Sequence, residues 1–500
     1  MIILWLLIFI VLILLFFILL KTLLWIYTAE RYVHNIPGPK ASLPLIGNAA
    51  ILSKIHSLKD MFHTAKDLIE NYSTGTNRIV KLWMGPKLMI FLGDHKHIEA
   101  ILSSPDAVDK DPLYNIIGLT GNGIFVRNGI EWKDLRKPLN KVLNKKLIES
   151  NIDTFHNTAL KFCKVIHKYS CTGQKFDVKS YTTNYFLDTL AVSNFGHEIN
   201  ELENNRYNIS NVLKTSLEIT MQMMAKPQYN ISLTLTELTK MGRKLNNYSK
   251  FYWNFTNELL QGRIERRKHM DENDGIEFYS DFLLKKAEEN KLTQDERGRL
   301  VTDFVIAGFD SSAVITSYAF LMLAMFPEYQ EALYQEQVDI LGENLDESLK
   351  WEHLSQMTYL SRVIKEVMRL YCPLAILRQL SKNVKLDEEY TLPKGSTAYL
   401  MFYSLHRDPK YWSHPQEFYP DHFLPEEVAK RPKGTYLPFS WGPRSCPGAQ
   451  LATITMKTLI SVAIRKYKFE TDMKYENLEH KYSLFLESNQ GYIVQIKERT

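Results

Sequence analysis

The chain has 500 residues, of which 45% are hydrophobic and 23% are charged, with a formal net charge of +5. Single hydrophobic cores rarely grow beyond about 250–300 residues, so the length favours two or more domains, while the small net charge gives no indication of a nucleic-acid partner. The four cysteines show no paired spacing, which argues against a zinc site or a disulfide framework and favours a reducing compartment.

The N-terminus is an unbroken apolar run over residues 2–20 that continues, after Lys21, to Tyr27. About 20 apolar residues suffice to cross a bilayer as a helix. A cleaved signal peptide is the alternative, but no basic segment precedes the run, and it exceeds the roughly 7–15 apolar residues of such peptides. Residues 1–27 are therefore predicted to be one retained transmembrane helix. Basic residues follow it, which predicts a cytosolic remainder.

The segment after the anchor, residues 28–48, is basic and proline-rich, and its second part reads IPGPKASLPLIGN. Three prolines and two glycines cannot continue a helix, so a linker or hinge is predicted here. No comparable Pro/Gly/Ser-rich stretch divides the rest, and there is no internal repeat. Residues 49–500 are therefore predicted to form the globular part.

The first globular elements follow from periodicity and turn residues. Residues 60–71 have a helical pattern, and residues 78–92 read as a β-hairpin whose turn is Gly85-Pro86. Residues 106–127 are mixed in character and predicted to be a loop. Several helices are predicted over residues 150–290, with breaks near Thr172-Gly173 and Pro227.

A basic helix is predicted over residues 131–146, which read EWKDLRKPLNKVLNKK. Trp132 and Arg136 stand four residues apart and therefore share one face of this helix. A solvated basic face with one packed tryptophan would explain the same pattern. The methionines of the 213–231 segment indicate an adaptable apolar wall, although ordinary core is the commoner meaning of such a cluster.

A long apolar helix is predicted over residues 293–325, and it contains the segment Ala307-Gly308-Phe309-Asp310-Ser311-Ser312. A glycine, an acid and hydroxyls are costly in a buried helix, so this segment requires an explanation. One structural explanation is a kink in which Ser311 bonds the carbonyl one turn back.

The next segment, residues 357–371, is a strongly amphipathic helix in which Glu366 and Arg369 stand three apart and can form an ion pair. Arg378 follows, residues 384–403 alternate as β structure with turns at 387–388 and 394–395, and a last hairpin is predicted over residues 482–496 with its turn at 487–491.

One cysteine stands in an unusual stretch, FSWGPRSCPG, over residues 439–448. Pro447 suits a first helical position, and a helical apolar pattern follows over 449–463. A sulfur at a helix N-terminus is favoured as a thiolate, and Gly442 and Gly448 allow a close approach of the backbone to a large flat partner. Taken alone, Cys446 would more often be a small buried hydrophobe.

The positions Phe439, Gly442, Arg444, Cys446 and Gly448 together resemble the haem-ligand loop of the cytochrome P450 superfamily, and the surrounding text is most similar to the family-4 clan of insect and vertebrate enzymes. The resemblance implies a mostly α fold with a smaller β-rich lobe, preceded by one N-terminal transmembrane helix. It also implies haem b, with a cysteine thiolate as the axial ligand of its iron. Ala307 stands where many fatty-acid hydroxylases carry a haem-esterifying Glu, so a non-covalent haem is expected.

The same resemblance assigns roles to the residues noted above. Asp310 and Ser311 match the acid and hydroxyl that relay protons, which implies catalytic roles. Glu366 and Arg369 match a buried structural pair, with His422 where arginine is usual. The cofactor-binding residues that it implies are Trp132, Arg136, Arg378, Phe439, Arg444, Cys446 and Gly448, with Cys446 as the metal ligand.

The implied function is a membrane-bound monooxygenase that inserts one oxygen atom from O2 into an apolar substrate such as a fatty acid, a hormone-like lipid or a xenobiotic. The chain has no dinucleotide or flavin motif, so NADPH electrons would come from NADPH–cytochrome P450 reductase, with cytochrome b5 as a further candidate partner, at the endoplasmic reticulum membrane. Alternatives are a haem-thiolate isomerase or dehydratase and a non-catalytic haem-binding protein. The exposed lysines expected to dock the acidic flavoprotein are Lys133, Lys137, Lys141, Lys145 and Lys146.

Overall fold

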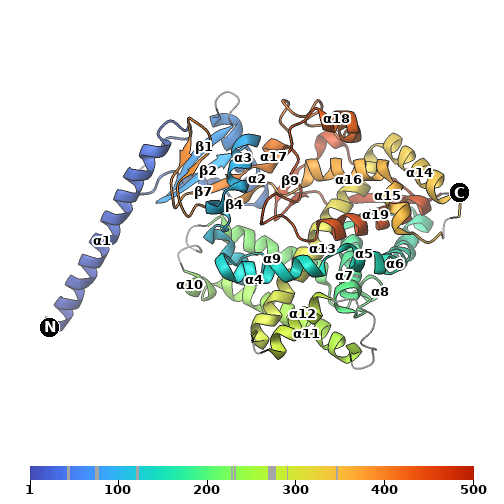
Figure 1. The fold of residues 1–500 in the computed structure, drawn as a ribbon, viewed down its shortest axis with the longest axis horizontal. Helices are drawn as coiled ribbons and strands as arrows, with labels where there is room; N and C mark the ends of the chain where they lie inside the picture. Colours follow the sequence, from blue (N-terminus) through green and yellow to red (C-terminus); the bar gives the residue numbers. More distant parts are fainter. Residues whose placement is uncertain are drawn as a thin grey trace. The chain divides into compact units, whose positions relative to one another are not determined.

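The computed structural model describes residues 1–41, 45–73, 78–119, 123–226, 229, 232–267, 278–289, 291–344 and 347–499. The chain forms two compact units (Figure 1), and it passes between them more than once. This return of the chain explains why no single linker divides the sequence. The β-rich unit comprises Met1–Pro112, Ala375–Leu405 and Trp441–Arg444, and the helical unit comprises Leu113–Leu374, His406–Ser440 and Ser445–Thr500.

The β-rich unit is built on a four-stranded sheet in the order β1-β2-β7-β4. Strands β1 (Ile79–Met84) and β2 (Lys87–Leu92) form the predicted hairpin, and Gly85 in its turn has a φ of +61°. Strand β7 (Thr397–Leu400) pairs parallel to β2, and β4 (Ile376–Gln379) pairs antiparallel to β7. The other elements of this unit are α1 (Ile2–Val33), η1 (Ala49–Lys54), α2 (Leu58–Tyr72), α3 (His95–Ser103), η2 (Pro105–Ala107), β5 (Val384–Lys385), β6 (Thr391–Leu392) and α17 (Phe402–Leu405).

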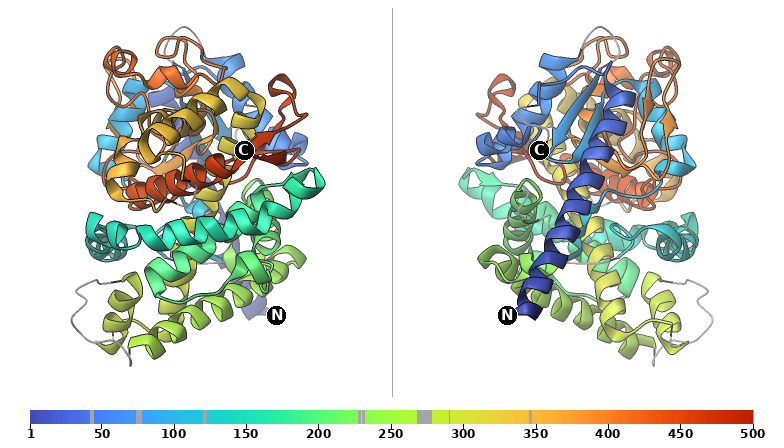
Figure 2. Two further views of the ribbon diagram at one scale, coloured as in Figure 1. Left: turned by 90° about the vertical axis from the view of Figure 1, so that its right-hand side faces the viewer. Right: turned by 90° about the vertical axis from the view of Figure 1, so that its left-hand side faces the viewer.

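Helix α1 has two different parts. Its first 20 residues are exposed and apolar, and the helix is long and apolar enough to cross a membrane. Its last turns pack on the β-rich unit, where Ala29 and Val33 are buried. The carboxylate of Glu30 accepts hydrogen bonds from Lys81 at 2.5 Å and from the Trp83 indole at 2.9 Å. The right-hand view of Figure 2 shows the dark blue helix reaching the blue strands, and residues 28–33 of the predicted hinge are therefore helical.

The helical unit contains most of the chain. Its helices are η3 (Pro112–Leu119), α4 (Gly129–Val142), α5 (Lys145–Ser150), α6 (Ile152–Thr172), α7 (Lys179–Phe195), α8 (Glu201–Asn204), α9 (Ile209–Met224), α10 (Leu233–Glu237), α11 (Lys240–Arg267), α12 (Tyr279–Glu288), α13 (Gln294–Met325), α14 (Pro327–Leu341), α15 (Trp351–Gln356), α16 (Thr358–Tyr371), η5 (Pro420–Phe423), α18 (Pro425–Ala429), α19 (Ala449–Lys466) and η6 (Tyr475–Asn477). The predicted fold class, mostly α with a smaller β-rich part, is confirmed.

Some predicted elements differ from the structure. The basic helix expected over 131–146 ends at Val142, and α5 starts again at Lys145 because the Asn144 side chain caps its first turn. The break at Thr172-Gly173 is confirmed, with Gly173 at a φ of +65°. Pro227 lies outside the described residues, as do 120–122 of the predicted loop, whose remainder includes two short 3-10 helices.

The predicted C-terminal hairpin over residues 482–496 is wrong in its pairing. Strand β10 (Leu486–Ser488) turns back onto β9 (His480–Tyr482), so the tight turn falls between those two strands. Strand β11 (Ile493–Glu498) instead pairs with β8 (Tyr467–Glu470) and with the short β3 (Phe176–Asp177). The alternating residues of this segment belong to strands of two separate sheets, and periodicity alone does not reveal which strands pair with one another.

Helix α13 is the core of the helical unit. It is as apolar as a membrane span over part of its length, but 72% of that window is buried inside the protein. Its N-terminus carries a capping box between Thr293 and Glu296, which fixes the predicted start of the helix. On one face, the Thr182 hydroxyl of α7 lies 2.8 Å from the Ser317 hydroxyl, so the two helices are joined by polar as well as apolar contacts.

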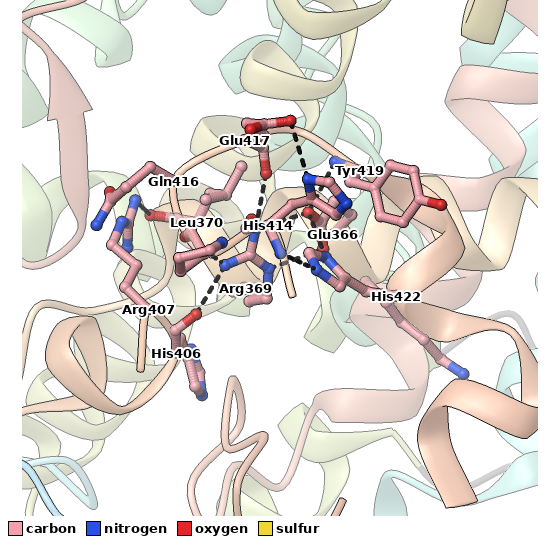
Figure 3. A network of polar contacts seen from close by, with 12 residues as sticks. Glu366, Arg369, Leu370, His406, Arg407, His414, Gln416, Glu417, Tyr419 and His422 are labelled. Carbon is pink, nitrogen blue, oxygen red and sulfur yellow. Dashed lines mark hydrogen bonds and ion pairs between the residues drawn. The ribbon is translucent and has the colours of Figure 1, made fainter. Parts of the chain in front are cut away.

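The pair predicted on α16 is fully buried (Figure 3). Arg369 donates to both carboxylate oxygens of Glu366, at 2.9 and 2.7 Å. The same guanidinium also donates to the backbone carbonyls of His406, Pro415 and Glu417 at 2.7–2.9 Å. Burial works to raise the pKa of Glu366, but the charge and hydrogen bonds of Arg369, together with His422, outweigh burial and lower the pKa. The pair therefore stays ionised and fixes the chain around it.

His422 completes the network without adding a charge. Its Nε2 accepts a hydrogen bond from the His414 N–H, so the proton of the neutral ring lies on Nδ1, which is 3.1 Å from Glu366. The histidine therefore supplies the hydrogen bond of the usual arginine but not its charge. Arg431 packs over the Trp412 ring nearby and donates to the His422 carbonyl.

We expect Glu366→Gln to lower the free energy of unfolding by about 3–5 kcal/mol, because it leaves the Arg369 charge buried without a counter-ion. The matched control is Glu417→Gln, whose side chain is exposed and, within the part of the chain that the structure describes, forms an ion pair with His414. The control should change stability by no more than about 0.5 kcal/mol. Urea unfolding followed by tryptophan fluorescence measures both, and equal losses in the two variants would contradict the assigned role.

Candidate active site

The conformation of the cysteine loop is fixed by a hydrogen bond of its own backbone. The N–H of Cys446 donates to the carbonyl of Phe439 at 2.8 Å, which closes the loop and leaves the sulfur exposed. Helix α19 begins at Ala449 with Gly448 as its N-cap, so the prediction that Pro447 occupies the first helical position is wrong. By contrast, Cys163 and Cys372 are buried, and burial raises the pKa of each thiol to about 12.

Two predicted cofactor-binding arginines belong to the β-rich unit. Arg444 lies with its guanidinium 3.8 Å from the Asp109 carboxylate, and Arg378 of β4 forms a backbone bridge with Lys110. In the same unit, Gly442 has a φ of +77°, and a Cβ there would meet the Leu102 carbonyl oxygen at 2.5 Å. The close backbone approach expected of this glycine is thus made to the chain itself.

Helix α4 of the helical unit carries the predicted pair. Trp132 is buried, and the Nε of Arg136 is buried without a hydrogen-bond partner among the described residues. Burial lowers the pKa of the Arg136 guanidinium, while the nearby Cys446 sulfur acts in the opposite direction. A partly desolvated cation therefore lies within electrostatic reach of the exposed cysteine.

Helix α13 opens at one point along its buried length. Ala307 and Gly308 are exposed, and Ser311, half-buried one turn later, donates to the Ala307 carbonyl at 3.1 Å, as the structural explanation predicted. A Cβ at Gly308 would meet a methyl carbon of Leu190 at 2.3 Å, so this glycine is needed for packing against α7. Asp310 is buried on another face, and burial raises its pKa to about 6.

The methionine cluster is ordinary core where the structure describes it. Met221 and Met223 are buried, and Met223 packs with Ile219 and Leu245 in one apolar cluster. The commoner interpretation of the pattern therefore holds for these two residues.

Comparison with known proteins decides the family. The sequence profile described as Cytochrome P450 matches residues 36–495. The chain belongs to the cytochrome P450 family. It is 27% identical to cytochrome P450 4V2 of Mus musculus over 93% of this chain and 90% of that protein, and 27% identical to cytochrome P450 4c3 of Drosophila melanogaster over 94% and 90%. Cytochrome P450 4c21 of Blattella germanica is 26% identical over 91% of each chain.

These matches confirm several predictions. The relatives named above all carry family-4 names, as the loop text indicated. The P450 is an oxidoreductase of the monooxygenase class, and its cofactor is non-covalently held haem b with a cysteine thiolate ligand. Members of the family take electrons from a redox partner and act on apolar substrates.

The residues of the helical unit fit such a cofactor. A Cβ added at Gly448 would meet nothing within 4 Å, so the backbone beside the exposed Cys446 borders open space. The buried Nε of Arg136 is a donor without a partner among the described residues, which suits an anionic propionate. Ala307 and Gly308 are exposed on α13, so this helix also presents a surface of small side chains that leaves room for a bound group.

Sequence reasoning missed His406, which forms a hydrogen bond to the segment that leads into the cysteine loop of the P450. Its Nε2 accepts a hydrogen bond from the Leu437 N–H at 2.8 Å, and its Nδ1 lies 3.2 Å from the Cys372 sulfur. Burial, followed by the charges of Arg369 and Arg407, lowers the pKa of His406 to about 3. No motif in the sequence marks this residue, because its partners are distant along the chain.

We expect His406 to make the P450 less stable in mild acid. In the unfolded chain His406 binds a proton below its ordinary pKa of about 6.5, whereas in the folded chain it stays neutral down to about pH 3. Between these two values the free energy of unfolding therefore falls as the pH falls. The slope contributed is up to about 1.4 kcal/mol per pH unit. In His406→Gln, whose amide oxygen can still accept from Leu437, this contribution should vanish. Thermal midpoints between pH 7.5 and 5 measure it.

The control for this experiment is His34→Gln, because His34 is exposed. It should keep the pH dependence of the unchanged protein. A pH dependence in His406→Gln that matches the unchanged protein would show that His406 does not cause the acid sensitivity.

Proposed function

We propose that this P450 inserts one oxygen atom from O2 into an apolar substrate, with Cys446 as the axial ligand of the haem iron. The supporting observation is that Cys446 is exposed in a closed backbone loop, within reach of the Arg136 charge. Cys163 and Cys372 are buried thiols, and the exposed Cys171 lies in the last turn of α6, away from any helix N-terminus.

The cofactor supplies the oxygen-activating chemistry, and the chain supplies binding and protons. Trp132 and Arg136 of α4 would hold a propionate, with Phe439 and Gly448 beside the sulfur. Arg378 and Arg444 of the β-rich unit are further cofactor-binding residues in this proposal. All three arginines can form the bidentate contacts that carboxylates favour.

Asp310 and Ser311 would serve as the proton relay. The Ser311 hydroxyl gives its own proton to the Ala307 carbonyl, which leaves its oxygen lone pairs free to accept a proton-bearing partner on the half-exposed side. Asp310 has a pKa raised to about 6 by burial, so its carboxyl exchanges protons close to neutral pH. Protons would thus reach the exposed face of α13 from within the protein.

NADPH–cytochrome P450 reductase is the proposed electron donor, with cytochrome b5 as a further candidate. The lysines expected at the docking surface are all exposed on α4 and α5, which suits an acidic partner: Lys133, Lys137, Lys141, Lys145 and Lys146. The exposed apolar part of α1 supports a membrane anchor, and we place the protein at the endoplasmic reticulum membrane with residues 49–500 in the cytosol. The substrate is a fatty acid, a hormone-like lipid or a xenobiotic.

Cys446→Ser should abolish the thiolate-type absorption of the reduced carbon monoxide complex and the NADPH-dependent oxidation of substrate, because a serine hydroxyl does not ionise at neutral pH. Spectra and turnover are measured on the full chain co-expressed with reductase and screened against lipids and xenobiotics. Cys171→Ser removes another exposed thiol and should retain both signals. Retention of both by Cys446→Ser would refute the assignment.

Ser311→Ala should keep the haem but release more hydrogen peroxide, with product per NADPH falling about tenfold or more, because a proton-relaying hydroxyl is lost. Ser311→Thr keeps the hydroxyl on a stiffer side chain and should couple at least as well as the unchanged protein. Peroxide and product are counted against NADPH consumed. Unchanged coupling in Ser311→Ala would remove Ser311 from the relay.

A further inference from the structure

A chain of alternating charges runs from the surface of the helical unit to Asp310. Glu218 of α9 lies 3.3 Å from Lys481 of β9, and Lys481 lies 3.9 Å from Glu487 of β10. Glu487 then pairs with Lys179 of α7 at 2.9 Å, and Lys179 lies 4.0 Å from Asp310 of α13. Only Glu218 is well exposed, at 36%, and each later side chain is at most 17% exposed.

The helix geometry explains why Asp310 faces this chain. Asp310, Ala313 and Ser317 are spaced three and four apart, so they share one face of α13. Thr182 of α7 bonds both the Ala313 carbonyl and the Ser317 hydroxyl, which places that face against the start of α7. Lys179, the first residue of α7, stands one turn before Thr182, and so reaches Asp310.

Lys179 is shared unequally between its two carboxylates. It makes a hydrogen-bonded ion pair with Glu487 at 2.9 Å but remains 4.0 Å from the Oδ1 of Asp310. That Oδ1 is buried and has no hydrogen-bond partner among the described residues. A buried carboxylate with one oxygen left without a hydrogen bond and with a distant counter-ion is poorly stabilised as an anion.

The titration directions agree with this geometry. Burial raises the pKa of Asp310 to about 6; Lys179 opposes this rise and Glu487 adds to it. Burial works to lower the pKa of Lys179, but its attraction to Glu487, Asp310 and Asp177 together raises that pKa. Burial likewise works to raise the pKa of Glu487, but Lys179, Lys481 and a hydrogen bond from Ser483 together lower it. Near neutral pH, the exchangeable proton of the cluster therefore belongs to Asp310.

Among the residues that the structure describes, the other ionisable groups around the cluster do not provide a second counter-ion for Asp310. Asp177, at the start of α7, adds negative charge near Lys179. Burial, with a smaller contribution from the Asp310 charge, raises the pKa of Tyr252 on α11, so this tyrosine stays uncharged at neutral pH. Lys481 acts on Glu487 rather than on Asp310.

We propose that Glu487 and Lys179 are positioning residues for the proton relay: by holding Lys179 close, Glu487 leaves the Asp310 carboxyl free to gain and lose a proton close to neutral pH. The proposal rests on the proposed function of Asp310 as the relay acid. The protonated carboxyl gives its proton to the relay that contains Ser311 and takes another from water. The chain of ion pairs from Glu218 to Asp310 is the polar route by which this proton would be resupplied from the surface.

Two substitutions should move the Asp310 proton in opposite directions. Glu487→Gln frees Lys179 to pair with Asp310, so the pH midpoint at which Asp310 loses its proton should fall by about one pH unit or more. Lys179→Met removes the cation, so the midpoint should rise by about one pH unit or more. The infrared carbonyl band of the protonated carboxyl reports this midpoint in the full-length protein, with Asp310→Asn identifying the band.

The controls separate charge from packing. Lys179→Arg should restore a midpoint close to that of the unchanged protein, and Lys481→Met, which removes the more distant cation, should shift it far less than Lys179→Met. Opposite shifts in the two test variants support the proposal. No shift, or shifts in the same direction, would overturn it. If Glu487→Gln does not fold, Lys179→Met against Lys179→Arg decides the question alone, with an unmoved midpoint in Lys179→Met counting against the proposal.

The same variants show whether the relay itself fails. The pH profile of product per NADPH should move with the infrared midpoint in each variant. If the infrared midpoints move as expected while Asp310→Asn leaves coupling unchanged, Glu487 controls the proton but Asp310 is not the relay acid. That result would overturn the proposed role of Asp310 and leave the positioning of its proton intact.

Discussion

A guanidinium sealed from water needs an acceptor for each of its N–H groups, and Arg369 is completely buried. Two acceptors come from Glu366 on the same helix, and the others are backbone carbonyls between His406 and Glu417. That segment must therefore wrap around the end of the side chain. Because His406 in turn accepts a hydrogen bond from the Leu437 N–H, the segment that leads into the cysteine loop is attached to the same point. The place of Cys446 in the helical unit thus depends on a charge pair that does no chemistry.

The two buried charge clusters of this P450 obey the same physics with different results. Around Arg369 the guanidinium donates at 2.7–2.9 Å to both Glu366 oxygens and to three backbone carbonyls, with the His414 carbonyl further away at 3.5 Å, and the Glu366 carboxylate balances its charge. Around Lys179 two carboxylates compete for one ammonium, and the more distant one lacks a hydrogen bond. In the first cluster the contacts of Glu366 with Arg369 and His422 lower the pKa of Glu366, so this carboxyl stays ionised near neutral pH. The imbalance of the second makes one carboxyl titratable, which is a property that a proton relay needs and a scaffold does not.

Sequence analysis predicted the structure correctly where all the residues concerned lie within one short segment of the chain. The loop around Cys446, the Glu366–Arg369 pair and the course of α13 were all predictable, because their patterns span a few turns of chain. The charges around Asp310 were not, because Lys179 and Glu487 come from distant segments and each looks like an ordinary surface residue in sequence. The wrong hairpin at the C-terminus has the same origin: alternation marks a strand but not its partner. What fails is the prediction of pairing between distant segments, rather than the prediction of elements.

Helix α1 changes character where it joins the rest of the β-rich unit. Apolar residues surround the whole helix over 2–20, which suits lipid, whereas Ala29, Val33 and Ile36 form a single buried stripe, which suits protein. Between these parts the Trp25 indole donates to the Pro86 carbonyl at the turn of the β1–β2 hairpin. The last turns of α1 are thus fastened to the β1–β2 hairpin by hydrogen bonds, so that a change in the direction of these turns would move the hairpin with them.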